Sequence, residues 1–199
     1  MPLLPLEPFV FPDDLFGRPS PGSGSPVRWW VLHTRPRAEK SLARRLLHRA
    51  HPFFLPLYKR QWPSRGRLLC SHVPLFPSYL FLQGDCHVRT AALETNLVAR
   101  VLPVEDQVQL QSDLERVYQL MSAGLPLTPE ERLEPGSLVE ITSGPLAGLQ
   151  GKVLRRGKHL KLFVEVQFLQ RAVSAEIDAW MVQPLSEPHA ATVLAAGRT

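Results

Sequence analysis

Two cysteine–histidine pairs are the residues of this sequence with the clearest capacity for chemistry. Cys70 stands two positions before His72, and Cys86 directly precedes His87. Zinc prefers thiolate and imidazole ligands, but structural zinc sites usually carry Cys-x₂-Cys pairs, which are missing here. We therefore expect no metal site and no cofactor. No Ser/His/Asp arrangement, phosphate-binding loop or paired-carboxylate motif stands out either, so we expect a protein that is not an enzyme.

The composition describes a globular, basic chain. Of its 199 residues, 44% are hydrophobic, and no uninterrupted apolar run reaches the length of about 18 residues that a membrane span needs. The formal net charge of +5 is compatible with an acidic partner such as nucleic acid. Two cysteines make no disulfide framework, and the proline-rich, acidic N-terminus is unlike a signal peptide. We expect a cytoplasmic monomer without a membrane partner.

Changes in composition divide the chain. Residues 1–26 are rich in Pro, Gly and Ser and are expected to form a disordered tail. Short strands and helices alternate over residues 27–123, including a helix that Ser112 and Glu115 would cap. This pattern predicts an α+β fold, an α/β sandwich whose mainly antiparallel four-stranded sheet has flanking helices.

The second half of the chain has a different period. Residues 124–134 contain prolines without periodicity and are expected to be a linker. Apolar and polar residues then alternate with period two over residues 135–185, which predicts a small five-stranded SH3-like β-barrel. We expect residues 186–199 to be a flexible tail.

The strand expected at residues 78–82 is apolar on both sides. Alternation places Tyr79 and Phe81 on one face and Leu80 and Leu82 on the other. A sheet in a small domain usually keeps one face polar unless something covers it. Two interpretations remain open: the aromatic residues pack under a helix of their own domain, or they form a docking surface for a partner.

A basic helix follows the first expected strand. Its apolar residues recur at helical spacing from Leu42 to Ala50, and arginines occupy the other side. Arginine suits contacts to phosphates and base edges, although a charged helix face is often only solvated. The candidate nucleic-acid-binding residues are Arg35, Arg37, Arg44, Arg45 and Arg49.

Two motifs resemble those of known families. The stretch "GSLVEITSGPLAGLQGKV" resembles the KOW motif of transcription elongation factors and some ribosomal proteins. The stretches "RWWVLHTRPRAEKSLARRL" and "LFPSYLFL" resemble the N-terminal domain of NusG-type transcription factors. Together the resemblance covers about residues 28–185. Ser78 replaces the glycine of the family's Phe-Pro-Gly-Tyr element. In this respect the N-terminal half looks closer to the specialised RfaH-like antiterminators. The KOW half is more similar to NusG itself.

The resemblance implies a function and partners. Such proteins bind the clamp helices of the RNA polymerase β′ subunit and promote processive, pause-resistant elongation or antitermination. The matching polymerase-binding residues are Phe76, Pro77, Tyr79 and Phe81. The resemblance also implies that the arginines named above contact the non-template DNA strand. An alternative from another class is a KOW-containing RNA-binding or ribosome-associated module.

The KOW half implies a further partner. In NusG, one loop of this domain binds a ribosomal protein or the termination factor Rho. The residues that match the loop are Phe168, Leu169 and Arg171. This chain has Phe-Leu-Gln where NusG typically has Ile-Phe-Gly, which weakens the expectation of Rho binding in particular.

Overall fold

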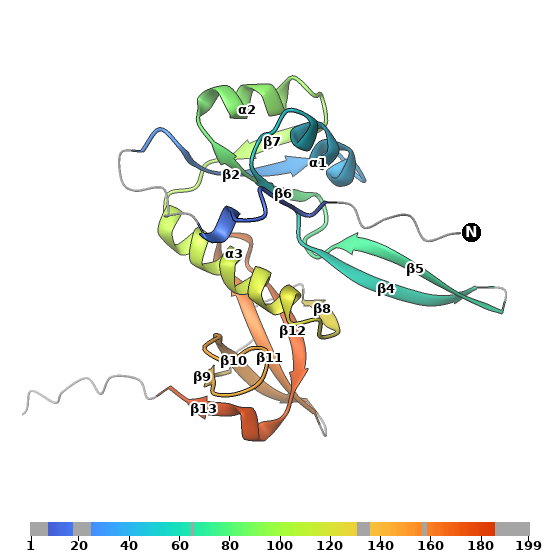
Figure 1. Ribbon diagram of the computed structural model, residues 1–199, viewed down its shortest axis with the longest axis vertical. Coiled ribbons are helices and arrows are strands. Elements are labelled where there is room, and N and C mark those ends of the chain that lie inside the picture. The colour runs from blue at the N-terminus through green and yellow to red at the C-terminus, as the bar shows by residue number, and fades with distance from the viewer. Residues whose placement is uncertain (1–7, 18–24, 65, 131–135, 157–158, 186–199) are drawn as a thin grey trace, which may run out of the picture.

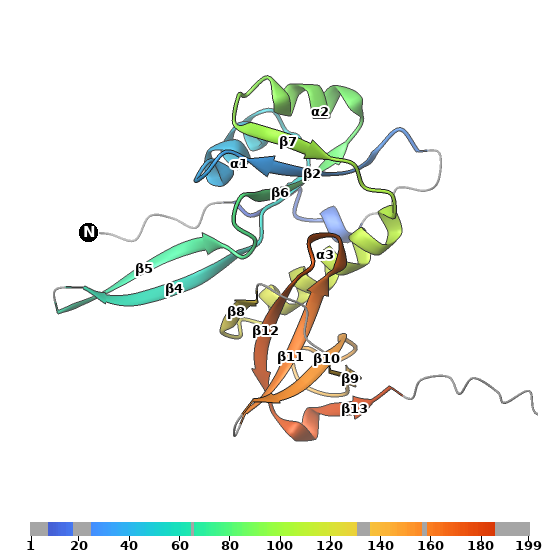
Figure 2. The same ribbon diagram turned by 180° about the vertical axis from the view of Figure 1, so that it is seen from behind.

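The structure, a computed structural model, describes residues 8–17, 25–64, 66–130, 136–156 and 159–185. Figure 1 shows an N-terminal domain of sheet and helices above a C-terminal sheet, with the long helix α3 (Gln107–Ser122) between them. A hairpin made of β4 (Leu57–Ser64) and β5 (Arg67–Pro74) extends sideways from the N-terminal domain (Figure 2). No helix among the described residues has the length and apolarity to cross a membrane.

The N-terminal sheet has five strands, and all neighbouring strands in it are antiparallel. In spatial order they are β1 (Val10–Phe11), β3 (Phe53–Phe54), β6 (Tyr79–Gly84), β2 (Arg28–Thr34) and β7 (Val98–Leu102). The expected mixed α/β architecture with an antiparallel sheet is confirmed, but the expected number of four strands is wrong. β1 comes from the segment that was expected to be disordered, and it adds an edge to the sheet.

Helices of the domain itself cover both faces of this sheet. On one face, α1 (Glu39–His48) contributes Leu42 and Leu46 to a cluster with Leu80 and Leu82 of β6, and α2 (Cys86–Leu93) packs on the same side. On the other face lies α3 (Gln107–Ser122), whose apolar residues join Phe81 in a second cluster. Burying a large apolar side chain contributes about 1.5–3 kcal/mol, so a strand that is apolar on both faces belongs between two layers.

The third helix begins earlier than the capping box at Ser112 predicts. It starts at Gln107, and the side chain of Asp106 accepts a hydrogen bond of 2.8 Å from the Gln109 backbone N–H. An aspartate at the residue before a helix satisfies one of the N–H groups that the first turn leaves unpaired. The extra turn brings Leu110 into the core.

Residues 8–17, which we call the N-terminal arm, are ordered against the domain. The Leu55 backbone N–H donates a 2.6 Å hydrogen bond to the Phe9 carbonyl, and Leu15 is fully buried. The Phe16 ring lies 5.0 Å from the ring centroids of both Phe54 and Tyr118. The expectation of a disordered tail is therefore wrong for this segment, because its apolar side chains bury enough surface to offset the cost of ordering it. Residues 1–7 and 18–24 lie outside the described residues.

The C-terminal sheet is all β, as the period-two pattern predicts. Its strands, in spatial order, are β13 (Val182–Pro184), β9 (Ser137–Ile141), β10 (Gln150–Arg156), β11 (His159–Val166), β12 (Arg171–Ile177) and β8 (Leu127–Glu130). Six strands replace the expected five, and closure into an SH3-like barrel stays a prediction. The turn between β9 and β10 contains Gly144 and Gly148, with φ angles of +83° and +84° that favour glycine.

The extra strand β8 lies within the expected linker. It pairs antiparallel with β12, from Leu127 opposite Ala175 to Glu130 opposite Ala172. Pro129 lacks a backbone N–H, but β8 is an edge strand, where a proline is tolerated. The expected linker over residues 124–134 is thus wrong for residues 127–130. Residues 131–135 and the expected tail 186–199 lie outside the described residues.

Candidate interdomain and partner-binding site

The two domains meet along helix α3. One continuous hydrophobic cluster contains Leu114 and Val117 of α3 together with Val164, Val166 and Val173 of the C-terminal sheet. The 3₁₀ turn η2 (Gln167–Leu169), which joins β11 to β12, also contacts the helix. The structure therefore shows a closed arrangement of the two domains, by which we mean that the C-terminal sheet is packed on α3 (Figure 1).

Asp113 is the polar centre of this contact. Its carboxylate accepts hydrogen bonds from the Gln167 backbone N–H at 2.9 Å and from the Gln109 side-chain amide at 2.8 Å, and it pairs with Arg116. Burial raises the pKa of this carboxyl above its ordinary value of 3.8, although these donors and the arginine charge act in the opposite direction. A buried carboxylate is tolerated when N–H donors surround it.

The raised pKa gives a pH dependence with a definite sign. In the closed arrangement Asp113 holds a proton more tightly than it would after the domains separate, where its pKa would return toward 3.8. The closed arrangement is therefore favoured most below pH 3.8 and loses this contribution as the pH rises through the raised pKa. We expect amide chemical shifts at Gln167 to report this change in an acid titration. Asp113→Asn should abolish it, and an unaltered titration in that variant would contradict the assignment to Asp113.

The expected polymerase-binding residues do not form an exposed patch. Phe76 and Phe81 are 1% and 0% exposed, and their rings pack edge to face at 6.1 Å. Pro77 is exposed and Tyr79 is half-buried. The prediction of a surface aromatic patch is thus wrong for the two phenylalanines. Alternation along β6 places Phe81 on the face that α3 covers, and Phe76, in the turn before the strand, packs against the Phe81 ring in the same cluster. Binding of a partner at Pro77 and Tyr79 stays a prediction.

Ser78 has the backbone conformation expected of the glycine that it replaces. Its φ angle is 66°, in the left-handed region that side chains rarely adopt. The Ser78 backbone N–H donates a 2.7 Å hydrogen bond to the Glu39 carboxylate, which fixes this turn to the first residue of α1. The turn presents Tyr79 beside His33, with 5.2 Å between the ring centroids.

The residues of the C-terminal domain that were expected to bind a ribosomal protein or Rho instead face the N-terminal domain. Phe168 and Leu169 pack against the cluster around α3. The Arg171 guanidinium lies 5.6 Å from the centre of the Tyr79 ring, a cation–π geometry. A cavity of about 390 Å³ remains beside the contact and is lined by residues that include Asp106, Gln109 and Phe168. The closed arrangement thus places Tyr79, which was expected to bind polymerase, next to Arg171, which was expected to bind a ribosomal protein or Rho.

Part of the basic helix has a structural role. Arg45 donates to the Thr95 carbonyl at 3.2 Å, and Arg49 donates to the Ala91 carbonyl at 3.1 Å with Glu94 at 3.8 Å. Cations stabilise the carbonyl end of a helix, so these arginines attach α1 to the end of α2. Arg44 donates to Ser41 within α1, and Arg35 and Arg37 are exposed in the turn before it. Nucleic-acid contact by these five arginines stays a prediction.

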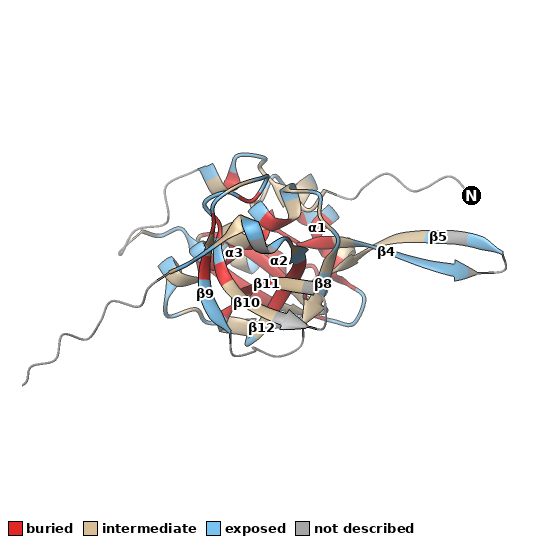
Figure 3. Cartoon of the chain, turned by 90° about the horizontal axis from the view of Figure 1, so that it is seen from below, coloured by how far each residue is buried: buried red, intermediate tan, exposed pale blue. Residues whose placement is uncertain are grey.

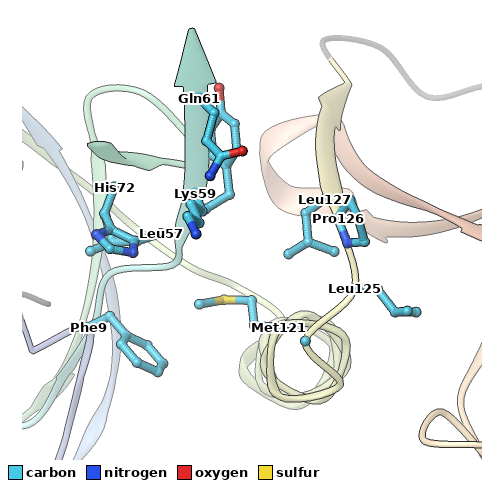
Figure 4. A pocket seen from close by; sticks show the side chains of 11 residues that line it. Phe9, Leu57, Lys59, Gln61, His72, Met121, Leu125, Pro126 and Leu127 are labelled. Atoms are coloured by element: carbon cyan, nitrogen blue, oxygen red, sulfur yellow. The ribbon is translucent and has the colours of Figure 1, made fainter. Parts of the chain in front are cut away.

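A second cavity lies where the hairpin leaves the N-terminal domain. It has a volume of about 430 Å³, and Figure 4 shows side chains of the arm, the hairpin, α3 and the segment before β8 around it. The labelled residues are Phe9, Leu57, Lys59, Gln61, His72, Met121, Leu125, Pro126 and Leu127. His72 and Cys70 belong to the hairpin, whereas Cys86 and His87 begin α2. Among the described residues, no group of three or more His, Cys, Asp or Glu could hold a metal ion.

Sequence reasoning missed Asp113 and the arm. The acceptor at Asp113 and the donor at Gln167 are 54 positions apart, and a polar residue on an amphipathic helix gives no sign of such a bond. The arm had a signal in the apolar side chains of residues 9–11, Leu15 and Phe16, which stand within a proline-rich stretch.

Comparisons with known proteins identify the N-terminal domain. Residues 27–121 match the family model described as transcription termination factor NusG. No curated protein matches the chain. A solved structure on domain interaction in Thermotoga maritima NusG is 15% identical with a TM-score of 0.45, and the match covers 80% of this chain and 98% of that one. A structure of the MjSpt4:Spt5 complex is 19% identical with a TM-score of 0.25, covering 80% and 97%.

Proposed function

The chain belongs to the NusG family of transcription factors through residues 27–121, and on this premise we propose that it binds RNA polymerase at the β′ clamp helices during elongation. The observation that carries the proposal is the position of Tyr79. It ends the Phe76–Tyr79 turn, is half-buried, and packs against the cluster that contains Phe81, with the His33 ring of its own domain on one side and the Arg171 guanidinium of the other domain over its ring. An aromatic residue held in this way is a typical anchor of a protein interface.

The proposed mechanism is binding and involves no chemical step. A factor that contacts the clamp and the opposite side of the DNA cleft favours the closed polymerase clamp. It needs only to bind the closed clamp more tightly than the open one, and the difference in affinity sets the effect. Such a factor would promote processive elongation and antitermination. We place it in the cytoplasm as a monomer, with the exposed Arg35 and Arg37 toward the non-template DNA strand.

We further propose that the closed arrangement withholds both partner sites. Tyr79 cannot meet the polymerase while Arg171 lies over its ring, and Phe168 and Leu169 cannot meet a ribosomal protein or Rho while they pack on the α3 cluster. The apparent association constant for polymerase then equals the intrinsic association constant multiplied by the fraction of molecules that are open. Separation of the domains would make both sites available at once.

Replacing Tyr79 tests the polymerase site. We expect Tyr79→Ala to weaken binding of the full-length protein to core polymerase by about 2–4 kcal/mol, the usual cost of truncating an interface anchor. The measurement is a titration with nuclease-treated polymerase. Trp180→Ala is the control, because it removes an aromatic side chain that is 69% exposed on the C-terminal domain.

Two results would reject this proposal. One is a folded Tyr79→Ala protein, judged by circular dichroism, that binds polymerase as tightly as the original chain. The other is polymerase capture that disappears after nuclease treatment, which would instead indicate an RNA-binding or ribosome-associated module.

A further inference from the structure

The hairpin of β4 (Leu57–Ser64) and β5 (Arg67–Pro74) is the least covered element of the N-terminal domain. Its strands pair only with each other among the described strands. Figures 1 and 2 show it reaching away from both domains, and Figure 3 shows exposed and intermediate residues along it. An isolated two-stranded ribbon is only marginally stable in water. A ribbon that nevertheless projects this far suggests that the hairpin contacts a partner beyond the surface of the two domains.

One face of the ribbon carries an exposed aromatic residue between cations. Trp62 pairs across the strands with Leu69, and they are 38% and 42% exposed. Residues two apart on a strand share a face, so Arg60 lies on the side of Trp62, and the register adds Arg67 through its pairing with Ser64. Arg60 and Trp62 line a shallow hollow together with Ser71 and Val73.

All the charged residues of the hairpin are basic. No aspartate or glutamate occurs in the sequence between Glu39 and Asp85. Lys59, Arg60 and Arg67 are exposed, and no carboxylate among the described residues forms an ion pair with them. They differ in this from Arg49, the residue that follows α1, which is paired with Glu94. A concentration of unpaired cations attracts a polyanion.

We propose that this face, formed by Arg60, Trp62, Arg67 and Leu69, binds single-stranded nucleic acid. A base would stack on the Trp62 indole over the hollow, while the two guanidinium groups contact phosphates on either side. Stacking on aromatic side chains combined with a basic track is the usual means of holding a single strand. A duplex keeps its base faces inside the stack, so an exposed indole flanked by arginines favours the unpaired strand. This site is separate from the polymerase site at Tyr79.

The test uses the full-length protein without polymerase. Anisotropy of labelled dT₁₂, rU₁₂ and a 12-base-pair duplex is measured over a range of salt concentrations. We expect Trp62→Ala to weaken binding of both single strands by about 10- to 100-fold, the range that loss of one stacked base produces. Trp62→Phe should restore most of the affinity. Trp180→Ala, which removes an exposed indole elsewhere, should leave it unchanged.

The charges are tested in the same assay. Arg60→Gln with Arg67→Gln should reduce the slope of log affinity against log salt by about 1.4, since each lost single-strand phosphate contact contributes about 0.7. The matched control is Lys40→Gln with Arg100→Gln, which removes two cations outside the hairpin. The proposal is overturned if Trp62→Ala binds like the original chain, if the control pair reduces the slope equally, or if the duplex binds more tightly than both single strands. Because polymerase is absent, none of these outcomes bears on Tyr79.

Discussion

Replacing Leu15 and Phe16 of the N-terminal arm with alanine should lower the free energy of unfolding of the N-terminal domain by about 4–7 kcal/mol. Leu15 is fully buried, and the half-buried Phe16 ring contacts three aromatic rings, those of Trp29, Phe54 and Tyr118. Cavities left in such a cluster are costly because the surrounding rings relax only partly. The expected loss is comparable to the total stability of a typical domain, about 5–15 kcal/mol.

Urea denaturation followed by tryptophan fluorescence measures this loss, since Trp29 lies beside Phe16. Leu93→Ala is the matched control, because that leucine is 39% exposed on α2, where truncation should change stability by less than about 0.5 kcal/mol. If the double variant unfolds at the same urea concentration as the original chain, the arm does not stabilise the domain and belongs to a loose tail after all.

Replacing Asp113 with alanine should open the closed arrangement and tighten polymerase binding. The substitution leaves the Gln167 backbone N–H without its acceptor at the domain contact. An unpaired buried donor costs about 1–3 kcal/mol, which shifts the equilibrium between closed and open molecules by about 5- to 150-fold. If most molecules are closed, the apparent dissociation constant for polymerase falls by the factor by which the open fraction rises.

Relaxation of backbone amides measures the opening, because two separated domains tumble faster than one closed body. Asp113→Asn is the matched variant: it keeps an acceptor oxygen for Gln167 and should open the protein less than alanine does. Faster tumbling without a gain in polymerase affinity would reject the masking of Tyr79. Unchanged tumbling would show that Asp113 does not hold the domains together.

Alternation predicted the layers of the fold, and it could not identify what covers them. Leu80 and Phe81 point to opposite faces of β6 and are both fully buried, as a strand apolar on both sides requires. The alternation of side chains along a strand is a local property, so it indicated only that both faces of this strand are covered. Whether Phe81 meets a helix of its own domain or a partner depends on where α3 packs, which is set by contacts far apart in the chain.

The composition of the sequence did not reveal two ordered segments. Prolines and glycines dominate residues 1–26, but stability depends on whether Leu15 and Phe16 find a groove, and composition does not contain that information. Pro129 indicated a linker by the usual rule for proline, yet the rule allows proline at a sheet edge. The site showed the same limit: Tyr79 and Arg171 were identified separately from two motifs, and their meeting depends on the packing of whole domains.

The pairing of β8 with β12 sets the length of the tether between the domains. With β8 in place, only the four residues 123–126 separate the end of α3 from the C-terminal sheet, a span of at most about 14 Å. If β8 detached, the tether would run through residues 123–136, fourteen residues that could reach roughly 50 Å when fully extended. A longer tether lowers the effective concentration of each domain near the other. Pairing of this edge strand with β12 therefore limits how far the C-terminal domain can move from the N-terminal domain.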